Sequence, residues 1–409
     1  MSSRFTRRMM WAVVVTAVAA PAAAQQTVQL PAKDNVLKER PADVFTVGTV
    51  EGRDWEMFSG IRAVAFDGAD NMYLLDGQNT RIVVFDANGR FVRQFGRKGG
   101  GPGELETPLS MGLTADGSLV VSDLGNRSFV VFTTEGEYVR NIPFADELGF
   151  PTAMAIDRRG GIIARSMQRP RPGQSPADAA FSPIFRQPLD DADTQTLVRV
   201  PVAAPRVIES GGGRVAAMRM EPIFGPSPSF GVLPAGLALH HETEYAIRIL
   251  DDAGRPIRTL ARAYKPRKVT KKDQEKWQEQ RRRDQEAGAG PAVIMTRSTP
   301  AGSSTSIGSG APRSTSFHID DMPFAEFMSV VTSIRTDPQG RIWVQRRNAD
   351  GTARGPIDLV DANGRYIGTL PAQPLPNAVS ASGLAAWVTT DDELGVERVT
   401  VRRLPAGWR

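Results

Sequence analysis

Short apolar stretches alternate along this chain with clusters of turn-forming residues. Residues 72–75 (MYLL) and 82–85 (IVVF) are apolar, β-branched or aromatic, and each stretch is too short for a helix. Asn88-Gly89 follows the second stretch and permits the positive φ of a tight hairpin turn. Fully apolar short strands need cover on both faces, so the pattern predicts antiparallel hairpins in stacked sheets.

The pattern repeats with a fixed spacing. Residues 70–95 align without a gap on residues 117–142, which places Asp76 on Asp123 and Gly89 on Gly136. A third copy, residues 236–260, places His241 at the same position. Further copies give six units, with approximate boundaries at 57–104, 105–146, 147–207, 208–263, 324–373 and 374–405. Units of ~40–50 residues have the size of a four-stranded propeller blade, and blades hide their faces by packing in a ring.

A further strand is expected before the first unit, at residues 43–50 (DVFTVGTV). We expect it to complete the last blade, because an open ring would leave sheet edges unpaired. The predicted organisation is a signal peptide at 1–24, an N-terminal extension at 25–42 and a propeller at 43–405 with an insertion at 264–323.

The link between the first two units carries a family resemblance. Phe95-Gly96, a glycine cluster, Gly103-Glu104-Leu105 and Pro108 resemble the joint between consecutive NHL repeats. The spacing from Asp123 through Asn126 and Phe132 to Gly136 is similar to the same family. The resemblance implies an all-β fold, a six-bladed β-propeller of four-stranded antiparallel blades with one helical and disordered insertion.

The glycine-rich stretch 99–103 poses a choice between a phosphate cradle and a joint. A phosphate loop leads into a helix, but this stretch leads into the apolar run Met111-Gly112-Leu113, which predicts a strand. We therefore interpret it as the crossover between two blades. Such crossovers border one mouth of a ring, so Arg97 and Lys98 remain candidates for contact with an anion.

The insertion interrupts the repeats with a different composition. Its first half predicts a solvated helix from about Thr270 to Gly288, and its Gly/Ser/Thr-rich second half, residues 298–316, predicts disorder. It is either a tolerated surface excursion or a lid or partner-binding arm. In the second case, Trp277 beside Arg281–Arg283 would suit an acidic partner.

Few residues offer catalytic or metal chemistry. Adjacent strand residues point to opposite faces, so His240 and His241 cannot readily chelate one ion, and His318 is the third histidine. Asp76 and Asp123 serve equivalent turns, which favours turn capping over a catalytic pair. The peptide-amidating lyases share the NHL-type propeller but depend on histidine-bound metal, and three histidines argue against that activity.

Propellers of the gluconolactonase type hold a divalent cation on the axis with Glu, Asn and Asp. The expected inner strands at 61–64, 110–113 and 152–155 contain no carboxylate. Glu326, which precedes a further expected inner strand at 330–334, is the one acidic candidate. We therefore expect no metal or other cofactor, although a divalent cation stays open. The site candidates are Arg62, Asp76, Arg97, Lys98, Asp123, His241 and Glu326, and no catalytic role can be assigned to any of them.

Composition indicates the compartment and the class of partner. Arg4, Arg7 and Arg8 precede the apolar run 9–20 and a small-residue site at 22–24, which predicts an export signal and a periplasmic or secreted bacterial protein with no other membrane span. The chain has no cysteine, so disulfides are excluded. Its net charge of +5 comes from the signal and from residues 265–286, which gives no case for nucleic-acid binding.

Two functions stay open. The repeats without a catalytic constellation favour a monomeric binding scaffold for a protein, peptide or glycan at one face of the ring. The alternative is a lyase or lactonase-type hydrolase that acts in the central channel.

Overall fold

The computed structural model describes most of the chain. The described residues are 26–145, 149–167, 180–190, 193–203, 206–210, 214–218, 221–286, 292–299, 302–309, 319–390 and 395–408. The predicted export signal and His318 lie outside these residues.

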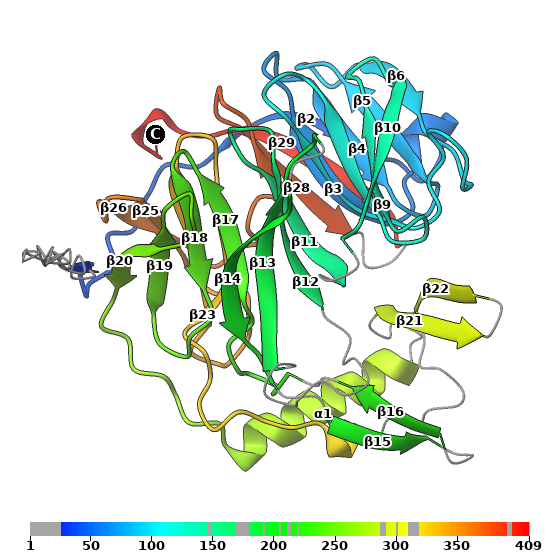
Figure 1. Cartoon of the computed structure of the whole chain (residues 1–409). Coiled ribbons are helices and arrows are strands. Elements are labelled where there is room, and N and C mark those ends of the chain that lie inside the picture. Colours follow the sequence, from blue (N-terminus) through cyan, green and yellow to red (C-terminus); the bar gives the residue numbers. More distant parts are fainter. Residues whose placement is uncertain are drawn as a thin grey trace, which may run out of the picture.

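Six sheets with four antiparallel strands each form the blades of a propeller, and one of them has a fifth strand at its outer edge (Figure 1). In chain order from the inner strand outward, the first three blades are β3 (Ile61–Phe66), β4 (Met72–Asp76), β5 (Arg81–Phe85) and β6 (Phe91–Phe95); β7 (Pro108–Leu113), β8 (Leu119–Asp123), β9 (Ser128–Phe132) and β10 (Tyr138–Pro143); and β11 (Phe150–Ile156), β12 (Ile162–Met167), β13 (Phe181–Gln187) and β14 (Gln195–Pro201). The last three are β17 (Ser229–Leu233), β18 (Gly236–His240), β19 (Ala246–Leu250) and β20 (Pro256–Ala261); β23 (Val331–Thr336), β24 (Arg341–Arg346), β25 (Ile357–Asp361) and β26 (Tyr366–Leu370); and β27 (Ala378–Val379), β28 (Leu384–Thr390), β29 (Glu397–Arg403) and β2 (Ala42–Val47). The predicted six-bladed propeller is confirmed.

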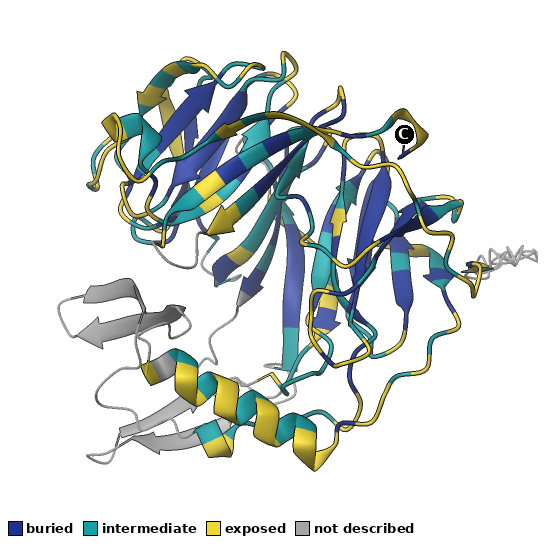
Figure 2. Cartoon of the chain, turned by 180° about the vertical axis from the view of Figure 1, so that it is seen from behind, coloured by how far each residue is buried: buried dark blue, intermediate teal, exposed yellow. Residues whose placement is uncertain are grey.

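The core lies between blades, because the middle strands of each blade are apolar on both faces (Figure 2). Leu74 of β4 packs toward the last blade, whereas its neighbour Leu75 packs toward the second. The described residues form six such buried clusters, one at each blade–blade interface. Full burial of one such side chain stabilises the fold by about 1.5–3 kcal/mol, so the closed ring is what holds the blades together.

The N-terminal segment, residues 26–47, forms a belt along the outer edges of three blades. β1 (Gln26–Gln29) pairs in parallel with β20 and makes the fourth blade five-stranded. Val36 forms a parallel bridge with Thr369 of β26. β2 then pairs antiparallel with β29 and supplies the outer strand of the sixth blade. The belt therefore covers edges that would otherwise present unpaired backbone groups to solvent.

The two mouths of the ring differ. One mouth, here called the connector mouth, holds the links between blades and the turns between second and third strands; the other, the turn mouth, holds the remaining hairpin turns. The elements outside the blades gather at the connector mouth in Figure 1: the hairpin β15 (Arg206–Ser210) and β16 (Arg214–Met218), helix α1 (Lys271–Glu286), and the hairpin β21 (Ala292–Thr299) and β22 (Gly302–Ser309). Short 3-10 turns lie at Asp54–Glu56, Ile319–Asp321 and Ala406–Trp408.

Two details differ from the expectations. Residues 298–316 were expected to be disordered, yet residues 302–309 of that stretch form β22, which pairs with β21 in register from Ala292–Ser309 to Thr299–Gly302. Its threonine and isoleucine suit a strand, and the Gly/Ser-rich composition hid that pattern. Residues 310–316 lie outside the described residues. The unit expected at 208–263 contains a separate hairpin, β15–β16, and its blade begins at Ser229.

Candidate functional site at the connector mouth

Asp76 ties the first blade to the connector that precedes it, and Asp123 does the same in the second blade. The Asp76 carboxylate accepts hydrogen bonds from Ser59 N (3.1 Å) and Asn79 Nδ2 (2.7 Å). The carboxylate of Asp123 accepts from Glu106 N and Thr107 N (both 2.7 Å), from Gly125 N (3.0 Å) and from Asn126 Nδ2 (2.9 Å). Both aspartates are fully buried. Their oxygens therefore satisfy backbone donors at a turn and at a connector.

The glycine-rich connector folds around a carboxylate of its own chain. Glu104 accepts hydrogen bonds from Gly101 N (2.8 Å) and from Arg97 Nε (2.9 Å). These bonds lower the pKa of Glu104. A Cβ on Gly99, where φ is +151°, would lie 2.1 Å from Glu104 Oε2, so this position favours glycine. Lys98 bridges to Leu105 through the backbone. The stretch is thus a blade-to-blade joint, and Arg97 has an internal partner.

The two neighbouring histidines have different surroundings. His240 is buried, and its Nδ1 lies 3.1 Å from the carbonyl oxygen of Ala246. Next to it, His241 is half-buried and occupies the position of Asp123 in the strand register. Burial lowers the pKa of both, and Arg248 lowers that of His241 further. Both are therefore neutral at pH 7.

Arg62 and Glu326 lie on different elements of the mouth, an inner strand and a connector. Arg62 is exposed on the inner strand β3, and its side chain crosses Gly77, where a Cβ would lie 2.4 Å from Arg62 Cγ. Glu326 precedes β23 and is mostly exposed, 4.0 Å from Lys268 Nζ. Among the described residues, no hydrogen bond or ion pair joins any two of the seven predicted site residues across blades. The structure thus places all seven on or near this mouth but does not bring them to one point.

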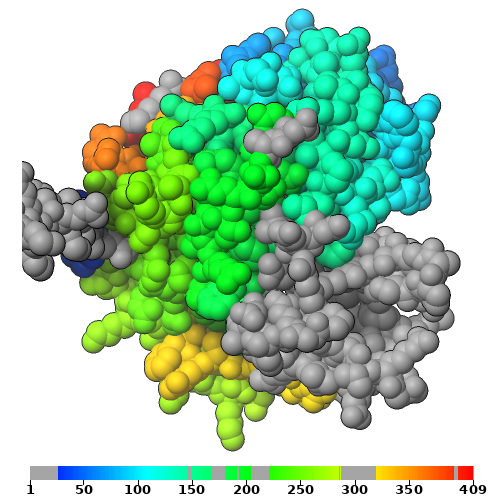
Figure 3. Space-filling view, viewed as in Figure 1, coloured from blue at the N-terminus to red at the C-terminus, as the bar shows by residue number. Residues whose placement is uncertain are grey.

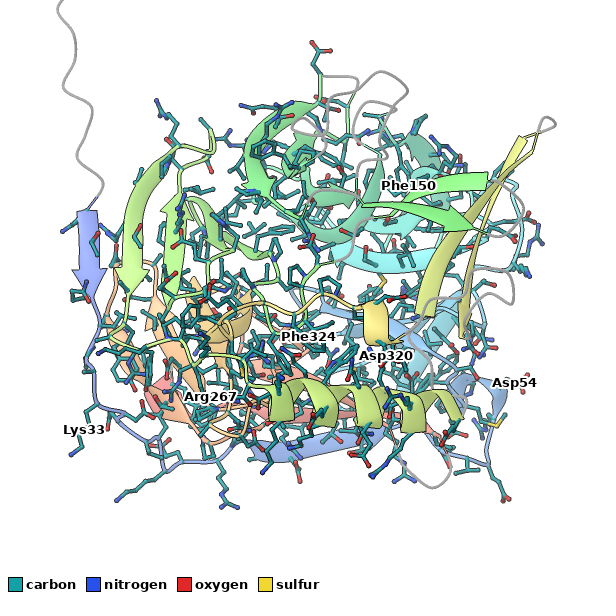
Figure 4. All side chains as sticks on the ribbon, turned by 90° about the horizontal axis from the view of Figure 1, so that it is seen from below. Lys33, Asp54, Phe150, Arg267, Asp320 and Phe324 are labelled. Carbon is teal, nitrogen blue, oxygen red and sulfur yellow. The ribbon has the colours of Figure 1, made fainter. Side chains whose placement is uncertain are left out.

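Three chain segments build a cap over this mouth, here defined as residues 221–225, 262–286 and 319–329. The segments are joined by backbone hydrogen bonds, including Ile223 N to the Pro323 carbonyl (2.8 Å) and Val269 N to the Glu326 carbonyl (2.9 Å). Seen from below in Figure 4, α1 crosses the mouth and Phe324 lies over the inner part of the ring. The cap also projects beneath the blades in the space-filling view of Figure 3.

Aromatic rings hold the cap together. Phe324 meets Trp277 of α1 edge-on at 5.7 Å and Phe224 at 6.1 Å between ring centroids. The guanidinium groups of Arg281 and Arg347 lie over Trp277 and Phe224, both at 5.6 Å. Phe224 adopts a φ of +67°, which a bulky residue rarely does. Sequence patterns missed this cluster because its members are about fifty to one hundred residues apart.

The arginines of α1 are paired within the chain. Arg282 binds Asp320 (2.7 Å), Arg283 binds Glu279, and Arg281 lies 3.7 Å from Asp284. The helix begins at a capping box in which Thr270 and Asp273 exchange hydrogen bonds. A bidentate contact from Arg267 strongly lowers the pKa of Asp273. An acidic partner that bound Arg281–Arg283, as expected from the sequence, would therefore have to displace carboxylates of the same chain.

A second buried charged cluster lies between the fourth and fifth blades, under the belt. Arg262 and Asp358 are fully buried and paired at 2.7 Å. Asp34 of the belt binds both Arg262 (2.8 Å) and Arg346 (2.7 Å). Arg346 occupies the register position that Asp123 holds in the second blade. This cluster holds the belt against the fourth and fifth blades, and no local sequence motif indicates it.

The described residues offer neither a cluster of metal ligands nor a membrane-spanning helix. In those ranges, no group of three or more His, Asp or Glu side chains is placed to hold a metal ion. Nor does any helix there have the length and apolar character needed to cross a membrane.

Comparison with known proteins agrees with the fold. A family described as a 6-bladed β-propeller matches residues 42–158. Human E3 ubiquitin-protein ligase NHLRC1 is 30% identical over 88 residues, which is 22% of each chain. The peptidyl-glycine α-amidating monooxygenase B of Xenopus laevis is 29% identical over 182 residues, 42% of this chain and 21% of that protein. The chain thus spans about a fifth of the length of these relatives.

A solved structure resembles the chain over almost its full length. It is a DUF4221-family protein from Bacteroides vulgatus, with a TM-score of 0.51 and 11% identity over 89% of this chain and 98% of that one. At this level of identity the likeness concerns the fold alone.

Proposed function

Since the chain is an NHL-like six-bladed β-propeller, we propose that it is an exported bacterial binding scaffold that holds a protein, peptide or glycan at the connector mouth. The export signal at residues 1–24 supports a periplasmic or secreted location. A propeller fold by itself leaves function open, so the proposal depends on what is built on the ring.

The cap over one mouth is the observation that carries the proposal. Its three segments come from two connectors, one between the third and fourth blades and one between the fourth and fifth, and they present aromatic rings with arginines stacked on them. Phe327, next to this cluster, is 41% exposed. Aromatic and arginine side chains are enriched in recognition surfaces, because aromatic rings bury a large area with few rotatable bonds and the guanidinium offers several donors in a planar fork. The turn mouth carries no comparable structure among the described residues.

Site-specific photo-crosslinking in the bacterial host tests the proposal. A benzophenone amino acid at position 327 should capture a discrete partner, whereas the same group at Asn88, an exposed residue of the turn mouth, should not. The Phe224→Ala variant should weaken capture by the probe at 327 while circular dichroism shows the propeller intact. A partner that sugar-cleaving enzymes remove would be a glycan, and one that protease removes would be a polypeptide.

A turnover assay addresses the enzymatic alternative. Purified protein incubated with lactones and with amidated or hydroxyglycine peptides should give no product above buffer. Turnover together with equal crosslinking from positions 327 and 88 would overturn the binding proposal and favour a hydrolase or lyase.

A further inference from the structure

The inner strands of the ring contain basic but no acidic residues. β3, β7, β11, β17, β23 and β27 carry no Asp or Glu, and their two charged residues are Arg62 and Arg335. Both arginines are exposed to solvent. The inner strands therefore carry a positive charge that their own residues do not neutralise.

Arg335 lies one residue before the end of β23, near the turn mouth. Its Nη1 donates a hydrogen bond to the carbonyl oxygen of Asn377 (3.1 Å), and no carboxylate of the described residues pairs with it. The nearest acidic residue in sequence, Asp337, is already bound by Arg341 Nε (2.6 Å) and Trp343 Nε1 (2.8 Å). A guanidinium has five N–H donors, so Arg335 retains donors for another acceptor.

The surroundings of Arg335 combine water access with a low dielectric. Solvent reaches the side chain, yet burial lowers its pKa, because protein lies around it on several sides. It remains a cation at neutral pH, since a guanidinium does not deprotonate there. Coulomb attraction to an anion is stronger at such a site than on the outer surface.

The register of the blades shows why the arginine fits there. The residues at the same level of the other inner strands, aligned by their second-strand partners, are Ala65, Gly112, Ala155, Gly231 and Val379. A Cβ on Gly112 or Gly231 would press on the next inner strand, at 2.7 Å and 2.5 Å. Arg335 instead faces β27, which has only two residues, and reaches the backbone just before it. The short inner strand of the sixth blade thus leaves room for the one long side chain at this level.

We propose that Arg335 is an anion-binding residue of the channel, which takes a small carboxylate entering from the turn mouth. The planar guanidinium matches a carboxylate in geometry and charge. The hydrogen bond from Arg335 Nη1 to the Asn377 carbonyl oxygen fixes the direction of the side chain and leaves other N–H groups for the ligand. The site is independent of the cap and lies toward the opposite end of the channel.

The probes are sodium acetate and sodium glutarate, with sodium phosphate and sodium chloride as comparison anions at constant ionic strength. Binding is followed by the ¹⁵Nε resonance of Arg335, assigned from its loss in Arg335→Gln. We expect a saturable shift with the carboxylates that chloride does not produce, and at least ~10-fold weaker carboxylate binding by Arg335→Gln in calorimetry. Arg158→Gln, which removes an exposed charge at the same mouth, should bind like the parent protein.

Several results would overturn the proposal: no saturable shift with either carboxylate, an equal shift with chloride, or loss of binding in Arg62→Gln but not in Arg335→Gln. Equal or tighter binding of phosphate would replace the carboxylate assignment with another oxyanion. If Arg335→Gln does not fold, a crystal structure of the parent protein soaked in sodium glutarate gives a second measurement. Electron density for a glutarate carboxylate against the Arg335 guanidinium is expected, and its absence would contradict the assignment.

Discussion

The first two blades differ from the fourth and fifth blades in the contacts that hold the end of the second strand to the neighbouring connector. In the first pair, the second strand ends in an aspartate whose carboxylate accepts hydrogen bonds from backbone amides of the short connector before the blade. In the second pair, His241 and Arg346 occupy that position, and the connector between these blades runs from residue 262 to residue 330. Charge pairs with the N-terminal belt replace the local turn network. The ring therefore accepts long insertions where distant contacts take over from the repeat.

Removal of Asp358 should give the largest effect, because it tests the distant network. Asp358→Asn takes the carboxylate from the fully buried Arg262 and from Arg346, and leaves buried positive charge without compensation. We expect a loss of about 3–5 kcal/mol in the free energy of unfolding, measured by urea denaturation. Asp361→Asn is the matched control. Its ion pair is with the largely exposed Arg365, and an asparagine keeps the Oδ1 acceptor for the turn amides of Asn363 and Arg365, so the change should cost less than about 1 kcal/mol. Similar losses in both variants would refute the distinction between the two regions.

The local network gives the next largest effect. Asp123→Ala leaves the partly buried hydrogen bonds from the backbone amides of Glu106, Thr107 and Gly125 without their acceptor, and should destabilise the protein by about 2–4 kcal/mol. Hydrogen exchange should accelerate first at residues 105–107. Asp76 accepts hydrogen bonds from fewer backbone amides, and it also pairs with Arg81 (3.1 Å). Asp76→Ala should cost less, since Arg81 keeps the carbonyl oxygens of Asp54 and Met57 as acceptors. Fast exchange spread evenly over all blades would show that Asp123 has no local role.

The same contrast explains how much could be predicted from the sequence. The 47-residue repeat predicted the ring, because strand and turn patterns are local and recur at a fixed spacing. The seven site candidates all lie at or near the connector mouth, but their partners could be predicted only where the partner is close in sequence, as for Asn79 with Asp76. Asp34 lies more than 200 residues from Arg262, and nothing periodic marks either of them. Arg335 was missed because its significance depends on the short β27 and on small residues in other blades.

The pH dependence of stability separates the belt from the repeats. Burial raises the pKa of Asp34, but hydrogen bonds from Arg346 and Tyr264 and the charges of both arginines outweigh it, so the pKa lies below the ordinary 3.8. The stabilisation by Asp34 is therefore complete above pH 3.8 and is lost as the pH falls through the lower, folded-state value. The stability difference between the parent protein and Asp34→Asn should be constant near neutral pH and shrink below about pH 4. Equilibrium unfolding at a series of pH values measures it, and a difference that grows with acid would contradict the pairing.

The smallest effect concerns the glycine-rich joint of the repeat region. Gly99→Ala places a methyl group against Glu104 Oε2 at a positive φ and should cost about 1–2 kcal/mol. Gly100→Ala is the matched control, because its Cβ would come no closer than 3.4 Å to Asn126 Oδ1, and it should be close to neutral. Combining Gly99→Ala with Glu104→Ala should cost less than the sum of the two, since the second change removes the atom that the methyl group meets. Additive losses would mean that backbone strain at residue 99, and not the enclosed carboxylate, explains the glycine.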